Sequence, residues 1–504
     1  MKVFASFIFV TMCLVCFFCE ADDIAIAAKA FNGEIDRTRI SDLDIITRSD
    51  ALAHYIMGTV YDNCGVPQKA VYEYEEALKN EKDITEIHLR LGADLMLMNR
   101  LEEALSAIER VSEIDPENTR AHLLLAIIHS AKGEYNKAAT QHQEILKYDP
   151  GNLNTLTFLS NLFIAQKQFD KAAEVYEKML RIRDDDAFLY FNLGILYSKL
   201  ELLDKAEEKL IKATEMDENY LAAQILLGFI YEVDKKYDKA VKQYEKVLEI
   251  DPKNVDAHMR IIWVYCEQKK FEQAEEANEK MRKNTPDSAE VYLNSFSINL
   301  YREDVKEAEK SINDALSRGH KDASLYVALG YLNTAKKDYK KAAEAYEKAV
   351  LEDNENSAYK FYLAAALDQS GKREKAIAIL EEITKKEKVL PEAYNYLGYM
   401  YAEEGRDLEK GVMLIKKALV MDPENGAYLD SLGWAYYRMG EMDEALMRLE
   451  EAVKYLPDDP IVTEHLADVY YEKGNKEKAV SLWNKALKAD PENEGLRKKL
   501  AEKK

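Results

Sequence analysis

Small residues recur along this chain at intervals of 34 residues, and this spacing constrains the fold more than any other feature of the sequence. The series runs through Ala70, Ala104, Ala138, Ala172, Ala206, Ala240, Ala274, Ala308, Ala342 and Ala376, and after one inserted residue through Gly411, Ala445 and Ala479. A fixed period of this length marks a tandem repeat. Thirteen units fill residues 51–493, and they begin at residues 51, 85, 119, 153, 187, 221, 255, 289, 323, 357, 391, 426 and 460.

A second small position, position 8 of each unit, interrupts an apolar stretch. In LDSLGWAYYRMG (429–440) Gly433 stands inside a helical pattern, where glycine costs about 1 kcal/mol relative to alanine. We expect this glycine to let the first helix of its unit approach the second, with Ala445 facing it. Only Ile262 and Phe296 are bulky at this position, so we expect wider helix separation and changed curvature in units seven and eight.

The apolar residues of each unit show helical periodicity twice. They fall at positions 4, 7, 8 and 11, and then at 20, 24 and 27. Many units end in Asp-Pro-x-Asn, as at 115–118 and 422–425; proline cannot continue a helix, and the polar residues around it can cap the next one. Each unit therefore predicts two helices with short turns.

These residues resemble the tetratricopeptide repeat, which places Trp, Leu, Gly, Tyr, Ala, a large apolar residue, Ala and Pro along 34 positions. The last unit is similar at Leu466, Ala467, Tyr470, Gly474, Ala479, Trp483, Ala486 and Pro491. The resemblance implies an all-α fold, a right-handed α-solenoid of about thirteen 34-residue helix-turn-helix repeats with a concave groove that binds protein segments.

The amino-terminal residues 1–21 have the features of an export signal. Lys2 precedes an apolar run from Val3 to Phe18, and Cys-Glu-Ala stands before Asp22. Three interpretations stay open: a cleaved signal peptide, a lipoprotein signal with Cys19 lipidated, and an uncleaved membrane anchor. Each predicts an exported protein, periplasmic or membrane-attached in a bacterial cell envelope, similar to exported bacterial tetratricopeptide scaffolds.

The two flanks of the repeats predict small structural elements. Residues 22–50 are interpreted as a linker or a partial N-terminal cap. Residues 494–504 predict a C-terminal capping helix, because Leu496 and Leu500 can cover the last unit while the charged remainder meets water.

Charge and motifs narrow the classes of function. The net charge of −22 argues against nucleic-acid binding, which needs Lys and Arg to displace counterions, and disfavours adhesion to anionic lipid. The sequence holds no phosphate-binding loop, Gly-x-Ser-x-Gly or His-Glu-x-x-His motif. We therefore expect no enzyme, no catalytic residue and no cofactor, and we expect membrane contact only through the N-terminal segment.

Four histidines share position 4 of their units: His54, His88, His122 and His258. Tyrosine fills that position in other units, which favours a half-buried packing role over a metal site. Cys64 and Cys266 lie outside the leader and provide no disulfide framework.

The candidate binding residues lie on the other face of each first helix. In tetratricopeptide proteins positions 2, 5, 6, 9, 12 and 13 line the groove, and we call them the groove positions. Here they hold 15 aromatic residues, 13 acids and five bases. Aromatic residues exposed in a groove commonly mark a binding surface.

The predicted partner-binding residues are the position-9 aromatics and the neighbours of Trp434. They are Phe229, Trp263, Tyr331, Tyr399, Asp430, Trp434, Tyr437 and Arg438. The alternative for any one of the aromatics is packing between neighbouring repeats. A carboxylate clamp of Lys, Asn and Arg, as in chaperone-binding members of the family, is not present in any three adjacent units.

These features are compatible with two functions. The first is a non-enzymatic scaffold of the cell envelope that binds protein segments in an aromatic and acidic groove. The second is an assembly factor for an exported polysaccharide or a secretion machine, with aromatic contacts to glycan.

Overall fold

The computed structural model describes residues 42–386 and 390–503, and within these ranges the chain has 27 helices and no strand. The predicted all-α fold of about thirteen helix pairs is confirmed. The leader, including Cys19, lies outside the described residues.

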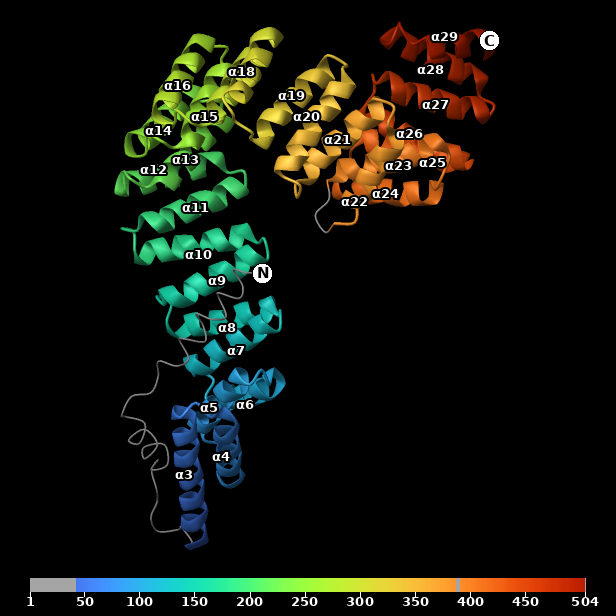
Figure 1. The fold of residues 1–504 in the computed structure, drawn as a ribbon. Coiled ribbons are helices and arrows are strands. Elements are labelled where there is room, and N and C mark those ends of the chain that lie inside the picture. Colours follow the sequence, from blue (N-terminus) through green and yellow to red (C-terminus); the bar gives the residue numbers. More distant parts are fainter. Residues whose placement is uncertain (1–41, 387–389, 504) are drawn as a thin grey trace. The chain divides into compact units, whose positions relative to one another are not determined.

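The helices alternate between the first and the second helix of each repeat (Figure 1). The first helices are α3 (Asp42–Asn63), α5 (Thr85–Leu97), α7 (Thr119–Ala131), α9 (Leu153–Ala165), α11 (Ala187–Lys199), α13 (Leu221–Val233), α15 (Val255–Glu267), α17 (Glu290–Tyr301), α19 (Ala323–Ala335), α21 (Ser357–Gln369), α23 (Pro391–Glu404), α25 (Gly426–Met439) and α27 (Pro460–Glu472). The second helices are α4 (Pro67–Asn80), α6 (Leu101–Ile114), α8 (Tyr135–Tyr148), α10 (Phe169–Ile182), α12 (Leu203–Met216), α14 (Tyr237–Ile250), α16 (Phe271–Asn284), α18 (Val305–Ser317), α20 (Tyr339–Glu352), α22 (Arg373–Ile383), α24 (Leu408–Met421), α26 (Met442–Tyr455) and α28 (Lys476–Ala489), and α29 (Glu494–Lys503) follows the last pair.

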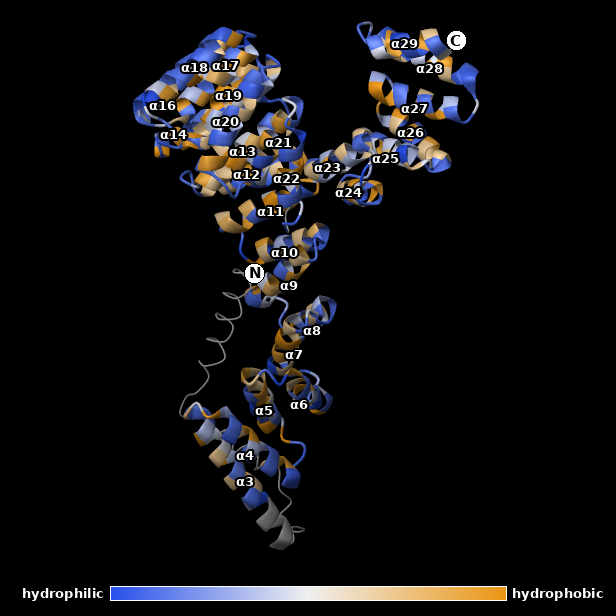
Figure 2. Cartoon of the chain, turned by 45° about the vertical axis from the view of Figure 1, so that its right-hand side comes forward, coloured by the Kyte–Doolittle hydropathy of each residue, from blue (hydrophilic) through white to orange (hydrophobic). Residues whose placement is uncertain are grey.

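The chain divides into two compact units, which we call the first unit (Met1–Ile250) and the second unit (Asp251–Lys504). From here on "unit" means one of these two parts, and each 34-residue helix pair is called a repeat. The first unit contains α3 to α14 and the second α15 to α29. Within each unit every helix packs against its neighbours along the chain, and most first helices, such as α7, carry more hydrophobic residues than their partners (Figure 2). The pair α23 and α24 is an exception. A first helix is apolar on a wide arc because it packs against several helices at once.

The Asp-Pro-x-Asn segments cap the helices that follow them, as their sequence predicts. The asparagine side chain of each segment accepts a backbone N–H near the start of the next helix. These asparagines are Asn118, Asn152, Asn254, Asn425 and Asn493. Each capped turn thus fixes where a new repeat begins.

The turn within each repeat contains a residue in the left-handed backbone conformation at position 15, and the turn of repeat eleven has a second one, Asp407. Glycine supplies it in six repeats, as at Gly474 with a φ of +86°. In the other seven repeats a residue with a side chain adopts a positive φ there: Asn99, Lys167, Glu201, Lys235, Lys269, Glu303 and Lys337. Such residues store strain, since the left-handed conformation costs roughly 1–2 kcal/mol away from glycine.

The small residue at position 8 accommodates a large side chain at position 24 of the same repeat. A Cβ atom on Gly433 would lie 2.6 Å from Leu449 Cγ, and the expected neighbour Ala445 approaches with its carbonyl oxygen, at 3.3 Å. In the same way Gly58 leaves room for Tyr74, and Gly228 for Tyr244. The space that the glycine opens is therefore filled mainly by the position-24 side chain and not by the alanine at position 20.

Repeats seven and eight combine a bulky position 8 with polar packing. Ile262 and Phe296 are both buried, and position 24 of repeat seven is the buried Asn278. Asn278 Nδ2 donates to the carbonyl oxygen of Val291 at 2.9 Å and to Ser295 Oγ at 2.9 Å, so α16 is joined to α17 by hydrogen bonds of a buried amide. The predicted change of curvature at these repeats stays a prediction.

Consecutive repeats are joined by a recurring tyrosine, glutamate and lysine. Tyr401 Oη donates to Glu381 Oε1 at 2.6 Å in the preceding repeat, and Lys410 Nζ lies 2.7 Å from the same carboxylate oxygen. The same arrangement recurs where Tyr470 bonds to Glu450 and Lys478 lies over the tyrosine ring. A single ion pair at the surface contributes little to stability. The tyrosine hydrogen bond contributes more, and it is lost when either of the two repeats unfolds.

The ends of the described chain extend beyond the repeats. Helix α3 begins at Asp42, nine residues before the first repeat. At the other end α29 buries Leu496 and Leu500 against the last repeat, in one cluster with Trp483. In the described part of the chain, no helix combines the length and apolar character that a membrane span requires.

Candidate binding surface

The groove positions carry a large share of the exposed apolar side chains. The described residues include 28 exposed large hydrophobic side chains, and 13 of them occupy the six groove positions of a 34-residue repeat. These are Ile56, Leu97, Leu123, Ile164, Phe188, Phe229, Val233, Met259, Trp263, Tyr301, Tyr331, Tyr362 and Ile461. Less than a fifth of the positions thus provides almost half of the exposed apolar groups, which is the pattern of a surface kept free for contact.

The position-9 aromatics differ in their exposure. Phe229 and Trp263 are each 39% exposed and Tyr331 is 56% exposed. Tyr399 and Trp434 are half-buried. The first three therefore present much of their surface to solvent, whereas the last two also pack inside the second unit.

Trp434 belongs to a stack of three rings at the last two repeats. Its ring lies 4.9 Å from that of Tyr437 with an interplanar angle of 21°, and 4.2 Å from that of His465 with an angle of 17°. His465 Nδ1 lies 2.9 Å from Asp430 Oδ1, and both of these side chains are buried. The structure thus brings Asp430, Trp434 and Tyr437 together, and it adds a histidine from the next repeat that the sequence analysis did not single out.

The carboxylates around His465 affect its pKa more strongly than its burial does. Burial opposes the protonated form, but the carboxylate of Asp430, followed by those of Asp468 and Glu464, raises the pKa of His465 above its ordinary value. A protonated His465 would form an ion pair with Asp430 against the face of Trp434. Protonation therefore strengthens the contact between α25 and α27.

A second ionic contact ties the last repeat to the terminal helix. Asp468 occupies groove position 9 but is buried, and its carboxylate accepts the indole N–H of Trp483 at 2.8 Å. Lys499 of α29 lies 2.7 Å from Asp468 Oδ2 and 2.6 Å from Glu464 Oε1. This position of the groove is therefore used to attach the end of the chain.

Tyr399 and Arg438 contact the same residue of α23. Tyr399 Oη donates to Glu403 Oε1 at 3.2 Å, and burial together with the charge of Glu403 raises the tyrosine pKa above its ordinary value. Arg438 Nη1 donates to the carbonyl oxygen of Glu403 at 2.7 Å. Arg373 of the preceding repeat forms an ion pair with the Glu403 carboxylate at 2.8 Å. Glu403 is therefore contacted by residues of three consecutive repeats: Arg373, Tyr399 and Arg438.

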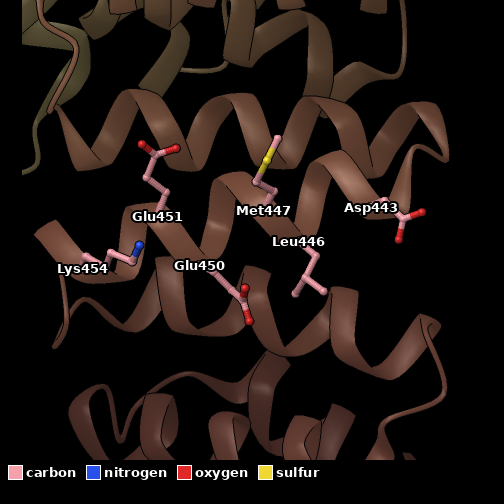
Figure 3. A pocket seen from close by; sticks show the side chains of 6 residues that line it. All are labelled: Asp443, Leu446, Met447, Glu450, Glu451 and Lys454. Carbon is pink, nitrogen blue, oxygen red and sulfur yellow. The ribbon is translucent and has the colours of Figure 1, made fainter.

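The hollows of the surface only partly coincide with the groove positions. A shallow hollow of about 330 Å³ lies entirely on α26, and its lining includes no groove position (Figure 3). It is lined by Asp443, Leu446, Met447, Glu450, Glu451 and Lys454. Another hollow, of about 500 Å³, lies in the first unit between Arg183, Phe188 and Tyr220, and Phe188 belongs to a groove position.

The position-4 histidines take part in packing and turn contacts. His122 and His258 are buried, and their Nε2 atoms lie within 3.0 Å of the carbonyl oxygens of Pro116 and Pro252. His54 pairs with Glu73. Among the described residues no group of three His, Cys, Asp or Glu side chains is placed to hold a metal ion.

His465, Asp468 and Lys499 are the residues of this surface that the sequence analysis did not identify. His465 stands at groove position 6 and Asp468 at groove position 9 of the last repeat, so the register already placed both on the candidate surface. At position 9 the last repeat has Asp468, whereas the two preceding repeats have Tyr399 and Trp434, and this change of residue type is the available signal. Lys499 had no such signal, because it lies outside the repeats.

The geometry defines a class of protein: tandem helix pairs, most of which expose a large apolar side chain on the same face of the first helix. Two sequence families, both described as tetratricopeptide repeat, match the chain, one at residues 95–162, 129–193, 234–294 and 334–398, the other at 191–255, 297–359 and 431–494. These segments together cover more than half of the chain. The chain belongs to the tetratricopeptide repeat family, whose members are scaffolds for protein–protein interaction.

The solved structures that match this chain share little sequence with it. The structure of Naa15/Naa10 bound to HypK-THB is 15% identical with a TM-score of 0.47, over 86% of this chain and 68% of that one. The Cut9 and Hcn1 hetero-tetramer of the APC/C is 15% identical with a TM-score of 0.44, over 92% and 99%. Yeast Tom70 is 16% identical with a TM-score of 0.38, over 90% and 99%. No curated protein matches the chain in sequence.

Proposed function

We propose that this chain is an exported scaffold of the bacterial cell envelope that binds segments of other proteins at its groove positions. The observation that carries the proposal is the concentration of 13 of the 28 exposed large hydrophobic side chains at those positions. Exposed apolar groups cost free energy in water unless a partner covers them, and aromatic anchors provide most of the affinity in protein interfaces.

The cellular location in this proposal rests on the amino-terminal sequence. Lys2 and the apolar run from Val3 to Phe18 support export. The proposal gives the chain no catalytic role, because the repeats occupy residues 51–493 and form a scaffold. It includes no nucleic-acid partner, and it limits membrane contact to the N-terminal segment.

Photo-crosslinking in the native cells tests the proposal. A benzophenone amino acid replaces Trp263 or Tyr331 at the groove positions, and in matched controls it replaces Leu351 or Val420, which are exposed by 77% and 82% on second helices. Protein adducts from the groove positions and not from the controls are expected. Equal adducts from all four sites, or adducts from the controls alone, would contradict the proposal. Adducts to glycan would favour the polysaccharide assembly factor instead.

Cell fractionation tests the location. The full chain is expected in the periplasmic or membrane fraction, and Cys19→Ser separates the interpretations of the leader. Release of the variant from the membrane would identify a lipid anchor at Cys19. Recovery of the unaltered chain in the cytoplasmic fraction would contradict export.

A further inference from the structure

The groove positions of the two units differ in charge. In the first unit they hold three acids and three bases: Asp62, Glu86 and Glu232, and Arg90, Arg120 and Lys199. In the second unit they hold two bases, Arg260 and Arg438, and ten acids: Asp256, Glu267, Glu290, Asp368, Glu392, Glu403, Asp430, Glu464, Asp468 and Glu472. The whole chain contains 92 acids and 70 bases, so the excess at these positions is far larger than the acidity of the chain explains.

The aromatic residues follow the same division. Ten of the 15 aromatic groove residues belong to the second unit: Trp263, Tyr301, Tyr331, Phe361, Tyr362, Tyr396, Tyr399, Trp434, Tyr437 and Tyr471. Of these Trp263, Tyr301, Tyr331 and Tyr362 are exposed. The second unit therefore combines carboxylates with aromatic rings on one surface.

Some of these carboxylates already have a partner within the second unit. Asp368 pairs with Arg373, and Asp430 with His465. Lys499 is shared by Asp468 and Glu464. These carboxylates are already neutralised within the folded chain, so we do not count them as sites for a positively charged partner.

A negative excess remains after these internal pairs are removed. Asp256, Glu267, Glu392 and Glu472 are exposed at groove positions of the second unit and belong to none of these pairs. Glu403 is exposed as well, but it pairs with Arg373 and is left out of the count. Glu267 accepts a hydrogen bond from the neutral Tyr301, which does not offset its negative charge. The exposed bases there, Arg260 and Arg438, do not balance the four carboxylates.

We infer that the groove positions of the second unit bind a segment of another protein that is rich in lysine and arginine. Carboxylates form charge-assisted hydrogen bonds with these side chains, and tyrosine and tryptophan rings attract cations over their faces. The negative field also accelerates encounter with a basic segment. The inference rests on the proposed function and specifies the chemistry of its partner.

Selection from a random-peptide phage library against the full chain tests this inference. The selected peptides are expected to contain at least twice the Lys and Arg of the unselected library and fewer acids. Selected peptides of neutral or acidic composition would overturn the inference but leave the proposed function standing. Failure to select any peptide above a protein-free control would count against both.

Matched variants separate a specific site from general attraction by an acidic protein. Glu392→Gln with Glu472→Gln removes two exposed groove carboxylates, and Glu347→Gln with Glu477→Gln removes two exposed carboxylates from α20 and α28. The groove pair is expected to weaken binding of a selected peptide about fivefold, in line with two exposed ion pairs, and the control pair to change it less than twofold. Fluorescence anisotropy of the labelled peptide measures both. Equal weakening by the two pairs would overturn the inference.

Discussion

Gly433 and Leu449 share one space: a Cβ atom on the glycine would lie 2.6 Å from Leu449 Cγ and 3.0 Å from Cδ2. Leu449 is fully buried, so it has little freedom to move away. The glycine is therefore required by the side chain that it faces and not by the conformation of its own backbone, which lies within α25. The cost of an interior glycine, about 1 kcal/mol, is offset by the burial of a leucine.

Replacement of this glycine is expected to destabilise the repeat. Gly433→Leu should lower the free energy of unfolding by roughly 1–3 kcal/mol, because it overfills a packed contact. Hydrogen exchange of α25 and α26 measures the change. Ala427→Leu, at an exposed position of the same helix, is the control and should have little effect. Equal protection in the two variants would show that Leu449 moves aside.

Loss of Trp434 is expected to affect binding more than folding. Trp434→Ala should weaken binding of a partner identified by crosslinking by about 2 kcal/mol or more, as aromatic anchors do. Some stability should be lost as well, about 0.5–1.5 kcal/mol, because the ring stacks on Tyr437 and His465. Titration calorimetry and thermal melting separate the two effects. A variant that melts as early as Gly433→Leu and binds normally would show that Trp434 is only a core residue.

The ion pair of His465 predicts that stability depends on pH. The pKa of His465 is raised in the folded state, so its contribution is fully present below the ordinary histidine pKa and is lost as the pH rises through the folded-state pKa. Melting of the full chain should therefore show a stabilising contribution at pH 6 that decreases towards pH 9. The same slope in His465→Gln would contradict this origin. Asp430→Asn is the matched variant, and it should reduce the slope because burial then dominates.

The left-handed turn residues predict both a stabilising and a destabilising substitution. Lys269→Gly should stabilise repeat seven by about 0.5–1 kcal/mol, since glycine relieves the strain but costs entropy in the unfolded chain. Gly474→Lys should destabilise the last repeat by about 1 kcal/mol, although the space around Gly474 is open. Denaturant unfolding of the two variants measures the pair of effects. Changes of the same sign would show that neither follows from the backbone conformation.

The contact between consecutive repeats predicts the effect of removing one hydroxyl. Tyr401→Phe removes the hydrogen bonds to Glu381 and Lys410 and should cost about 1 kcal/mol. Tyr331→Phe is the control, because this tyrosine is 56% exposed. Unfolding of the full chain, followed by circular dichroism, measures both. An equal loss in the control would mean that the inter-repeat bond contributes nothing of its own.

The sequence predicts the elements of this fold well, because each depends on local chemistry. Helical periodicity and the asparagine caps define the helix pairs from the residues of one repeat. The left-handed turn residues could not be foreseen at Lys167 or Glu201, since tertiary packing holds a strained conformation that local preference opposes. The repeat pattern likewise predicts Ala445 opposite Gly433, because it gives the register of two helices but not the reach of a side chain such as Leu449.

The candidate surface could be predicted only in part. The register identifies which positions face the groove, and the exposure of Phe229, Trp263 and Tyr331 agrees with it. The sequence does not show that the Asp430 carboxylate is bound by His465, which lies 35 residues further along the chain. Such a pair depends on how neighbouring repeats dock, and no periodicity within one repeat encodes it.

The fit between position 8 and position 24 has a consequence for how such a chain can be shortened, extended or recombined. A crossover that falls between repeats transfers both residues together, whereas one that falls in the turn joins the first helix of one repeat to the second helix of another. Joining α15 to α20 would set Ile262 against Tyr346, where the natural partner of that tyrosine is Gly330. A recombination crossover at a capped turn between repeats therefore preserves the packing of both repeats, whereas one inside a repeat disrupts it. The whole helix pair is the smallest segment that recombination can transfer without loss of this fit.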